Sequence, residues 1–222
     1  MNNYIVSKAF GAFYKVFIKP FSVRFNKKVS SQIPKYELSE IHIKNTKLLT
    51  TREELLKLLP KGGVVAELGV DEGGFSEKIL KLTQPEKLHL IDYWGTKRYN
   101  VNKRNGVELK FKNLIQNNKV EINLGYSTDV VKEFDDNYFD WIYIDTTHLY
   151  KTTIDELVLY HKKIKPNGII AGHDYILGNW DGIVRYGVIE AVYEFCVKYN
   201  WEIIYITAEL QPNPSFAIRK IG

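Results

Sequence analysis

Short apolar runs alternate with helical patterns over most of the chain, and this alternation constrains the fold more than any other feature. The runs that predict strands cover residues 64–68, 87–92, 120–125, 141–145 and 168–172. Strands separated by helices predict a parallel sheet with helices on both faces. After a last helix, two further runs at 201–207 and 215–220 can pair as a hairpin. We therefore expect an α/β fold: a doubly wound, mostly parallel sheet of seven strands with an antiparallel last strand.

Chain length limits the number of domains. A chain of 222 residues is long enough for one α/β domain and short for two. We predict one domain over residues 48–222, preceded by a basic N-terminal helical extension and connector over residues 1–47. The single cysteine, Cys196, excludes an internal disulfide, and its context AVYEFCVKY favours a buried structural thiol. A reducing, cytoplasmic setting fits this composition.

Positive charge is concentrated in the first 35 residues. They hold seven of the 31 Lys and Arg residues and no acid, which leaves 24 basic against 26 acidic residues in the remainder. We therefore expect no nucleic-acid partner. The segment 4–21 places Lys8, Lys15 and Lys19 on one side of a helix and aromatic residues over most of the rest. It predicts either peripheral contact with an anionic membrane or packing on its own domain or on a second copy in a homodimer, and packing is the arrangement we expect.

A glycine-containing segment, ELGVDEGGFS at residues 67–76, follows the first strand and opens a helix. Its glycines permit a tight turn and close approach of a ligand to the backbone. Asp71 and Glu72 would repel a pyrophosphate, which argues against a dinucleotide and for a ligand that carries positive charge. The second strand ends on Asp92, which is placed to bind ribose hydroxyls, and the flat side chains of Tyr93 and Trp94 follow. The alternative is a simple glycine turn with a solvated acid.

With these motifs the sequence resembles the class I S-adenosylmethionine-dependent methyltransferases, and within them the metal-dependent sugar O-methyltransferases related to the macrocin family. The resemblance rests on ELGVDEGGFS, LIDYWG, YIDTTHLY and KPNGIIAGHDY and covers roughly residues 60–207. It implies a Rossmann-like fold and S-adenosylmethionine as the cofactor. The departure from the family pattern is Asp71, where many class I enzymes have glycine. The cofactor-binding residues that the resemblance implies are Glu67, Gly69, Asp71, Gly73, Phe75, Ser76, Asp92, Trp94, Tyr126, Ser127 and Asp145.

Carboxylates and imidazoles follow two strands that should be neighbours in the sheet. Asp145 ends one strand and His148 lies three residues further on, while His173 and Asp174 end the next strand. Two carboxylates at adjacent strand ends are suited to a divalent ion such as Mg²⁺ or Mn²⁺. We predict Asp145, His173 and Asp174 as metal ligands and Asp145, His148 and His173 as catalytic residues. Either histidine is suited to accept a proton, and His173 is equally consistent with a third ligand, a base or a supporting residue. The alternative is a helix-capping acid with a packing histidine.

Together these features predict an O-methyltransferase that acts on a hydroxyl of a sugar or glycan precursor with the help of a divalent metal. A catechol-like small-molecule O-methyltransferase would need the same metal and an aromatic acceptor slot. A non-catalytic cofactor-binding or membrane-associated assembly protein would share the fold, but it would not need the combination of Asp145, His148, His173 and Asp174.

Overall fold

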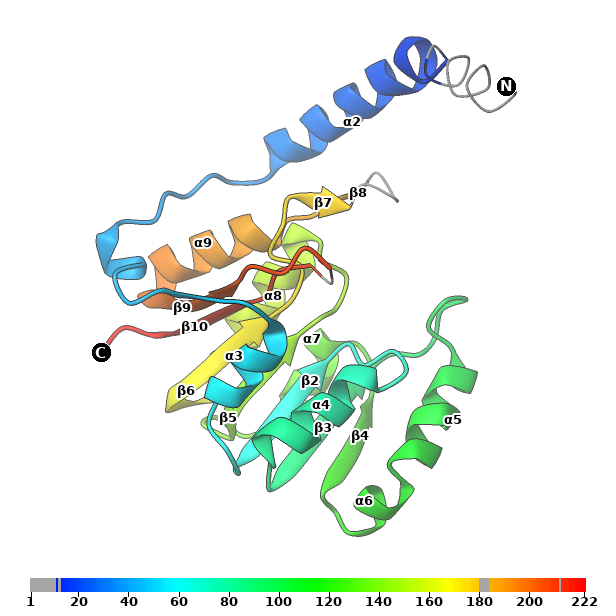
Figure 1. The fold of residues 1–222 in the computed structure, drawn as a ribbon, viewed down its shortest axis with the longest axis vertical. Helices are drawn as coiled ribbons and strands as arrows, with labels where there is room; N and C mark the ends of the chain where they lie inside the picture. The colour runs from blue at the N-terminus through cyan, green and yellow to red at the C-terminus, as the bar shows by residue number, and fades with distance from the viewer. Residues whose placement is uncertain (1–10, 12, 180–183, 212) are drawn as a thin grey trace.

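The protein is described by a computed structural model for residues 11, 13–179, 184–211 and 213–222. Its main sheet has the strand order β1-β9-β10-β6-β5-β2-β3-β4, and β7 and β8 form a separate two-stranded hairpin (Figure 1). The strands are β1 (Lys47–Leu49), β2 (Val64–Leu68), β3 (Lys87–Asp92), β4 (Val120–Leu124), β5 (Phe139–Ile144), β6 (Ile164–Gly172), β7 (Gly178–Asn179), β8 (Val184–Arg185), β9 (Trp201–Thr207) and β10 (Phe216–Lys220).

Helices cover both faces of the sheet. The helical elements are η1 (Tyr14–Ile18), α2 (Lys19–Gln32), η2 (Glu40–His42), α3 (Arg52–Leu58), α4 (Gly74–Thr83), α5 (Val101–Lys110), α6 (Lys112–Gln116), α7 (Ser127–Val130), η3 (Val131–Glu133), α8 (Tyr150–Tyr160) and α9 (Val188–Tyr199). The apolar residues of α8 and α9 pack on one face of the sheet. Those of α3, α4 and α5 pack on the other. Successive strand residues contribute to opposite cores because side chains alternate along a strand. The predicted doubly wound fold is confirmed.

The sheet is parallel except at β10, which pairs antiparallel with both β6 and β9. The predicted antiparallel last strand is therefore correct, but the predicted number of strands is wrong. An eighth strand, β1, pairs parallel with β9 from Lys47↔Tyr205 to Leu49↔Thr207. The sequence does not predict this strand, because three residues at the boundary between the predicted connector and the domain are too few to show an alternating pattern. Its place is set by the exposed edge of β9 and not by its own pattern.

Two other elements differ from the sequence expectation. The helix expected over residues 107–116 is two helices that break at Phe111. The first begins earlier, because the Asn100 side chain caps it by accepting hydrogen bonds from the backbone N–H groups of Asn102 and Lys103. Cys196 is buried and its pKa is raised by burial to about 12, as expected for a structural thiol.

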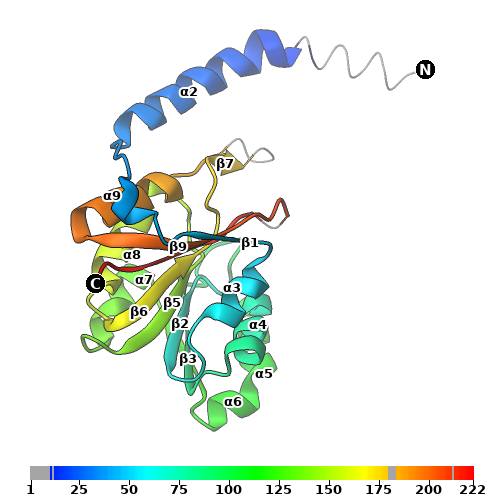
Figure 2. The same cartoon turned by 60° about the vertical axis from the view of Figure 1, so that its left-hand side comes forward.

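The helix α2 stands clear of the sheet and of the helices that cover it (Figures 1 and 2). None of the residues of α2 is buried. Phe21 of α2 is 75% exposed, and Phe17 of the preceding element η1 is 66% exposed. The expected packing of the arm on its own domain is therefore not seen for α2, whose residues stay exposed although the helix approaches the β8 strand. Residues 1–10, which include Lys8, lie outside the described part. No described helix is long and apolar enough to cross a membrane.

The strand order brings the carboxyl ends of β2, β5 and β6 to one edge of the sheet. Leu68 pairs with Ile144, and Ile144 pairs with Gly172, so the residues that follow these strands meet. The order also reverses at this point, because β3 and β4 lie on one side of β2 while β5 and β6 lie on the other. Ligands of such sheets bind at this reversal.

Candidate active site

The loop between β2 and α4 is pressed against the end of β5. Gly69 has φ +87°, and a Cβ atom there would lie 2.0 Å from the backbone oxygen of Asp145. The backbone N–H of Asp145 in turn donates to the Leu68 oxygen at 2.7 Å. Gly73 has φ +70°, and its Cβ would meet the Phe111 ring at 2.9 Å. Both predicted cofactor-loop glycines are therefore needed for backbone conformation and close packing.

Asp92 holds this loop from the end of β3. One carboxylate oxygen accepts hydrogen bonds from the backbone N–H groups of Val70 at 2.8 Å and Asp71 at 3.1 Å, and the other accepts from Trp94 N–H at 3.0 Å. Trp94 is buried beneath the loop, with its indole N–H bonded to the Asp71 oxygen at 2.9 Å. Asp92 thus lies beside the loop as predicted, whereas Trp94 supports the loop from below.

The outer rim of the site carries paired charge and paired rings. Lys103 of α5 forms ion pairs with Asp71 at 2.5 Å and with Glu72 at 3.1 Å, so one positive charge offsets part of the acidic rim expected from the sequence. Tyr93 and Tyr126, which follow β3 and β4, stack with ring centroids 4.2 Å apart. Both rings are partly exposed, and together they form a flat aromatic surface next to Asp92.

Glu67 lies at the bottom of the site and is buried. It accepts a hydrogen bond from the Ser76 hydroxyl. Burial raises the pKa of Glu67 to about 8, and the Ser76 hydrogen bond opposes the rise. Phe75 packs on Tyr143 with ring centroids 4.4 Å apart. The predicted residues Glu67, Phe75 and Ser76 therefore form one continuous wall beneath the glycine loop.

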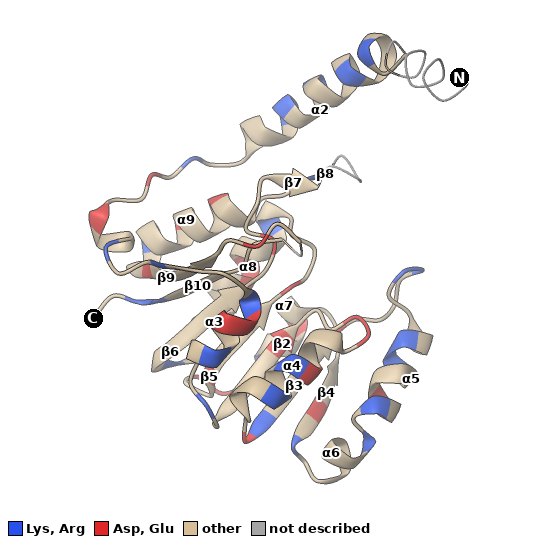
Figure 3. Cartoon of the chain, viewed as in Figure 1, with Lys and Arg blue, Asp and Glu red and all other residues tan. Residues whose placement is uncertain are grey.

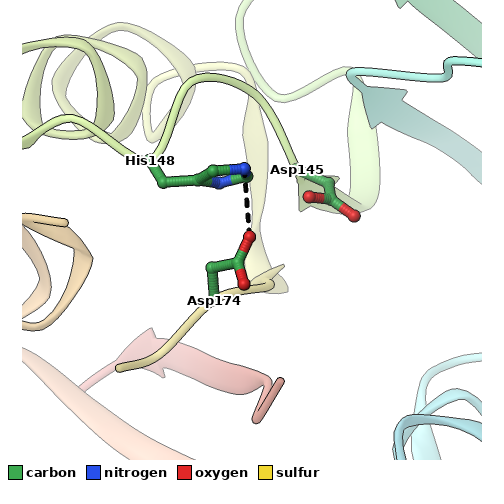
Figure 4. Close-up of side chains that lie close together, drawn as sticks. All are labelled: Asp145, His148 and Asp174. Carbon is green, nitrogen blue, oxygen red and sulfur yellow. Dashed lines mark ion pairs between the residues drawn. The ribbon is translucent and has the colours of Figure 1, made fainter. Parts of the chain in front are cut away.

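Asp145, His148 and Asp174 form a compact group at the ends of β5 and β6 (Figure 4). One ligand atom from each lies within 4.8 Å of the others. His148 Nε2 and an Asp174 oxygen are 3.0 Å apart, and the second Asp174 oxygen accepts from the Asn213 amide at 2.5 Å. His148 and Asp174 adopt φ values of +59° and +55°, which non-glycine residues rarely do. Backbone strain of this kind often accompanies functional sites.

The charges of this group are linked. Burial is the main cause that raises the pKa of Asp145 to about 7, and the neighbouring Asp174 carboxylate raises it further while His148 opposes the rise. Burial alone would lower the pKa of His148, but the hydrogen bond and charge of Asp174 outweigh it and raise that pKa. For Asp174 burial alone would raise the pKa, but the hydrogen bond and charge of His148, together with the Asn213 hydrogen bond, outweigh burial and lower that pKa. Such a group attracts a cation or a proton.

His173 lies apart from this group. Its Nδ1 atom is 3.1 Å from the Ser215 hydroxyl, which is itself 2.8 Å from the Tyr143 hydroxyl. Burial lowers the pKa of His173 to about 4, so the ring is neutral at physiological pH. Of the predicted metal and catalytic residues, the structure brings together Asp145, His148 and Asp174, and it places His173 in a buried hydrogen-bond chain behind them.

Glu156 of α8 is a buried carboxylate that the sequence analysis missed. It accepts hydrogen bonds from the Ser127 hydroxyl at 2.5 Å and the Thr146 hydroxyl at 2.9 Å. Burial raises its pKa to about 7. The predicted cofactor residue Ser127 is thus tied to the loop that carries Asp145. Glu156 shares a helix face with Thr153 and Tyr160, both buried, and an acid on that face was the available signal.

Cavity size does not mark the position of the candidate active site. A hollow of about 500 Å³ lies beside β4, α5 and α6 and is lined in part by Arg104, Glu108 and Lys112. A much smaller hollow, of about 10 Å³, is lined in part by His148 and His173. In the segment that follows β6 and Asp174, Arg185 of β8 forms an ion pair with Glu190 and donates a hydrogen bond to the Leu177 backbone oxygen at 3.0 Å. Trp180 of that segment lies outside the described residues.

A family model matches the part of the chain that contains the candidate site. Residues 66–175, which run from β2 to just beyond Asp174, match the family described as Methyltransferase domain. No curated protein matches the sequence.

Solved structures share the fold at low identity. A protein from Clostridium thermocellum assigned as an rRNA methylase has a TM-score of 0.58 at 16% identity, over 77% of this chain and 94% of that one. A Streptococcus mutans protein assigned as a methyltransferase, in complex with S-adenosylhomocysteine, has a TM-score of 0.55 at 13% identity, over 77% and 96%. M. capricolum TrmK, also with that product, has a TM-score of 0.54 at 16% identity, over 78% and 70%.

The family match and the fold define the class of protein. The chain has the class I methyltransferase fold, and its residues 66–175 are a methyltransferase domain. The match to a methyltransferase domain and the fold indicate a methyltransferase, and two of the solved structures that share the fold hold S-adenosylhomocysteine, the product of S-adenosylmethionine.

Proposed function

We propose that this methyltransferase acts on a hydroxyl of a sugar or glycan precursor and that a divalent metal assists it, as in the macrocin-type enzymes it resembles. The observation that carries the proposal is the group of Asp145, His148 and Asp174 at adjacent strand ends. Two carboxylates and an imidazole that converge beside the cofactor loop are suited to activate a hydroxyl, because a hydroxyl must lose its proton as it accepts a methyl group.

The residues around the glycine loop fit the cofactor. When bound, S-adenosylmethionine supplies an electrophilic methyl group on a positively charged sulfur. Gly69 leaves the loop backbone open at the end of β2, and Glu67 offers a carboxylate to the positive amino-acid end. Asp92 lies where the ribose is expected, and the stacked rings of Tyr93 and Tyr126 offer an aromatic surface for the adenine. These assignments support one cofactor orientation, with the methyl group directed toward Asp145.

Asp145 and Asp174 would hold the metal, because their buried carboxylates converge and the charge of Asp174 already disfavours ionised Asp145. When bound, a divalent ion would lower the pKa of the acceptor hydroxyl and fix its oxygen. His148 would accept the proton, since its ring is held by Asp174 at 3.0 Å. The carboxylates favour Mg²⁺ or Mn²⁺, and His148 makes Mn²⁺ the better probe.

The test is a methyl-transfer assay with purified full-length protein. Radiolabelled S-adenosylmethionine would be supplied with sugar nucleotides and free sugars that carry adjacent hydroxyls, with catechol, and with transfer RNA, each with Mg²⁺ and with EDTA. The proposal predicts metal-dependent label in a sugar. Label only in catechol would favour the catechol-like alternative. Label only in RNA would overturn the proposed acceptor class.

We propose a peripheral membrane contact for the arm. Phe13, Phe17, Phe21 and Phe25 repeat every four residues and are each more than half exposed. The same helical segment carries Lys and Arg but no acid (Figure 3). Two copies of such a helix would repel each other, whereas an anionic lipid surface complements both its charge and its aromatic side chains.

Co-sedimentation with vesicles of phosphatidylglycerol and phosphatidylcholine tests this contact. The full chain should sediment at low salt and less so at high salt, and Phe17→Ser with Phe21→Ser should abolish sedimentation. Leu109→Ser, which changes an equally exposed side chain on α5, is the control. Absence of sedimentation at low salt, or an arm-dependent dimer, would contradict the proposal.

A further inference from the structure

Arg52 is a half-buried cation at the candidate active site that neither the sequence analysis nor the proposed mechanism uses. It is the first residue of α3, directly after the capping residue Thr51. Its backbone N–H donates to Glu209 at 2.8 Å, and Glu209 also accepts from the Thr207 hydroxyl at 2.8 Å. The start of α3 is therefore fixed against the end of β9, and the Arg52 side chain projects from a rigid base.

The guanidinium lies over the aromatic wall of the site. Its central carbon is 4.5 Å from the centroid of the Phe75 ring. Phe75 follows the glycine loop and packs on Tyr143 of β5. Arg52 therefore reaches across the end of β2 from the side opposite to α8 and His148. Stacking on a ring fixes the plane of a guanidinium and leaves its N–H groups at the edge free to bind a ligand.

The charge of Arg52 acts on the acids at the bottom of the site. Burial is the main cause of the raised pKa of both Glu67 and Asp145, and the positive charge of Arg52 partly offsets the rise in each. Yet Arg52 forms no ion pair with either of them among the described residues, and its side chain interacts instead with the Tyr143 hydroxyl. Its Nε atom is buried and has no hydrogen-bond partner in the described part of the chain.

A buried guanidinium N–H without an acceptor is costly, so this position calls for an acceptor from a ligand. Guanidinium groups only donate, and their planar N–H pairs match a carboxylate. S-adenosylmethionine carries an ammonium and a carboxylate at its amino-acid end. Near the same loop Glu67 offers a carboxyl oxygen that can accept a hydrogen bond, and Arg52 offers a positive charge with N–H donors, which matches the ammonium and the carboxylate of this group.

We propose that Arg52 binds the carboxylate of the amino-acid end of S-adenosylmethionine, opposite the acid that receives the ammonium. The stacked Phe75 ring holds the guanidinium in place for this contact. The inference deepens the proposed function by assigning a residue to the methyl donor. It rests on the use of S-adenosylmethionine and on neither the metal nor the acceptor.

Two ligands separate this contact from a structural role. S-adenosylhomocysteine keeps the carboxylate, whereas 5′-methylthioadenosine has the same adenosine and sulfur but no amino-acid end. Calorimetric titration of Arg52→Gln should show a 10- to 100-fold weaker affinity for S-adenosylhomocysteine and an affinity for 5′-methylthioadenosine within threefold of the wild type. Arg52→Lys, which keeps the charge but not the planar donor pair, should fall between wild type and Arg52→Gln.

Arg104→Gln is the matched control, because Arg104 pairs with Glu108 on the surface of α5. It should leave both affinities unchanged. Equal weakening of both ligands by Arg52→Gln and Arg52→Lys would overturn the inference, as would an unchanged affinity for S-adenosylhomocysteine. An Arg52→Gln enzyme with unchanged product affinity and a raised KM for the acceptor would assign Arg52 to the acceptor instead. Failure of the wild type to bind S-adenosylhomocysteine would be a failure of the cofactor assignment, which is a different result.

Discussion

The carboxyl ends of β2 and β3 and those of β5 and β6 carry acids in very different surroundings. At the first pair, Asp92 accepts three backbone hydrogen bonds and Glu67 accepts one from Ser76. At the second pair, Asp145 and Asp174 converge, and the charge of Asp174 raises the pKa of Asp145. The acids on the β2–β3 side hold a preorganised loop and already have hydrogen-bond partners. The acids on the β5–β6 side have too little positive charge near them to balance both carboxylates.

This difference suits the two sides of the site to different tasks, namely cofactor binding and activation of the acceptor. A carboxylate whose oxygens accept hydrogen bonds from backbone N–H groups fixes the conformation of a loop. Its negative charge is then largely balanced and attracts a charged ligand only weakly. Two carboxylates that share one imidazole gain from an added cation, because each destabilises the ionised form of the other. We therefore assign cofactor binding to the β2–β3 side and activation of the acceptor to the β5–β6 side.

The largest expected effect follows from removing a charge at the β5–β6 side. Asp174→Asn keeps the shape of the side chain but removes the partner of His148 and one carboxylate of the group. We expect the rate of methyl transfer to fall roughly 10²- to 10³-fold, in line with the loss of a group that activates a nucleophile. The affinity for S-adenosylhomocysteine should stay within threefold.

Asp155→Asn is the control for this prediction, because Asp155 lies on the outside of α8 and pairs with Lys151. Steady-state kinetics with the acceptor found in the methyl-transfer assay make the measurement. A loss of cofactor affinity as large as the loss of rate would mean that the two sides of the site are not separate.

Because the glycine loop packs closely against the end of β5, we expect a side chain at Gly69 to lower the stability of the fold strongly. Gly69→Ala would place a methyl group 2.0 Å from the Asp145 oxygen at φ +87°. We expect about 3 kcal/mol of destabilisation, since strain and overlap both contribute. Gly74→Ala, where an added Cβ meets nothing within 4 Å, should be neutral or stabilising. Denaturant unfolding monitored by tryptophan fluorescence compares the two, and similar stabilities would show that the loop does not press on β5.

A smaller effect is expected from the acid that holds the glycine loop. Asp92→Asn leaves one oxygen and turns an NH₂ group toward backbone N–H donors, so at least one hydrogen bond is lost. We expect roughly tenfold weaker binding of S-adenosylhomocysteine, about 1.4 kcal/mol, and a lower melting temperature. Calorimetry and thermal unfolding measure both. An unchanged affinity would mean that Asp92 neither shapes the loop nor binds the ribose.

A further expected effect concerns the pH dependence of stability. The pKa of Glu67 is raised to about 8 from an ordinary 4.5, so its folded form holds a proton that the unfolded chain releases. Its contribution to stability is full below about pH 4.5 and is lost as pH rises toward 8. Between pH 5 and 8 we expect the wild type to lose on the order of 2 kcal/mol more than Glu67→Gln. Urea unfolding at both pH values makes the measurement, and parallel losses would contradict the raised pKa.

The sequence predicted those parts of the molecule that depend on local pattern. The predicted bounds of β2, β3 and β9 agree with the structure to the residue, because each is a short run dominated by apolar side chains. The meeting of Asp145 and Asp174 followed from the parallel order of their strands. The choice between His148 and His173 did not follow, because it depends on backbone direction. His173 and Asp174 are consecutive, so their side chains diverge, whereas the positive φ of His148 turns its ring back toward Asp174.

Other features depend on tertiary contacts that a local pattern does not contain. The strand β1 exists because β9 offers an edge. The role of Glu156 depends on hydroxyls from two other loops. Arg52 stands in a helix-capping segment before the first strand of the methyltransferase domain, and only the folded structure shows that it reaches Phe75.

The central claim is that the β5–β6 side is a cation site, and direct metal binding tests it. Mn²⁺ would be titrated into the metal-free full-length protein, and free Mn²⁺ would be followed by electron paramagnetic resonance. The account predicts one bound ion per chain in the wild type and in Asp155→Asn, and loss of that ion in Asp145→Asn and Asp174→Asn. Binding that survives both substitutions, or a wild type that binds no Mn²⁺ with S-adenosylhomocysteine present, would contradict it.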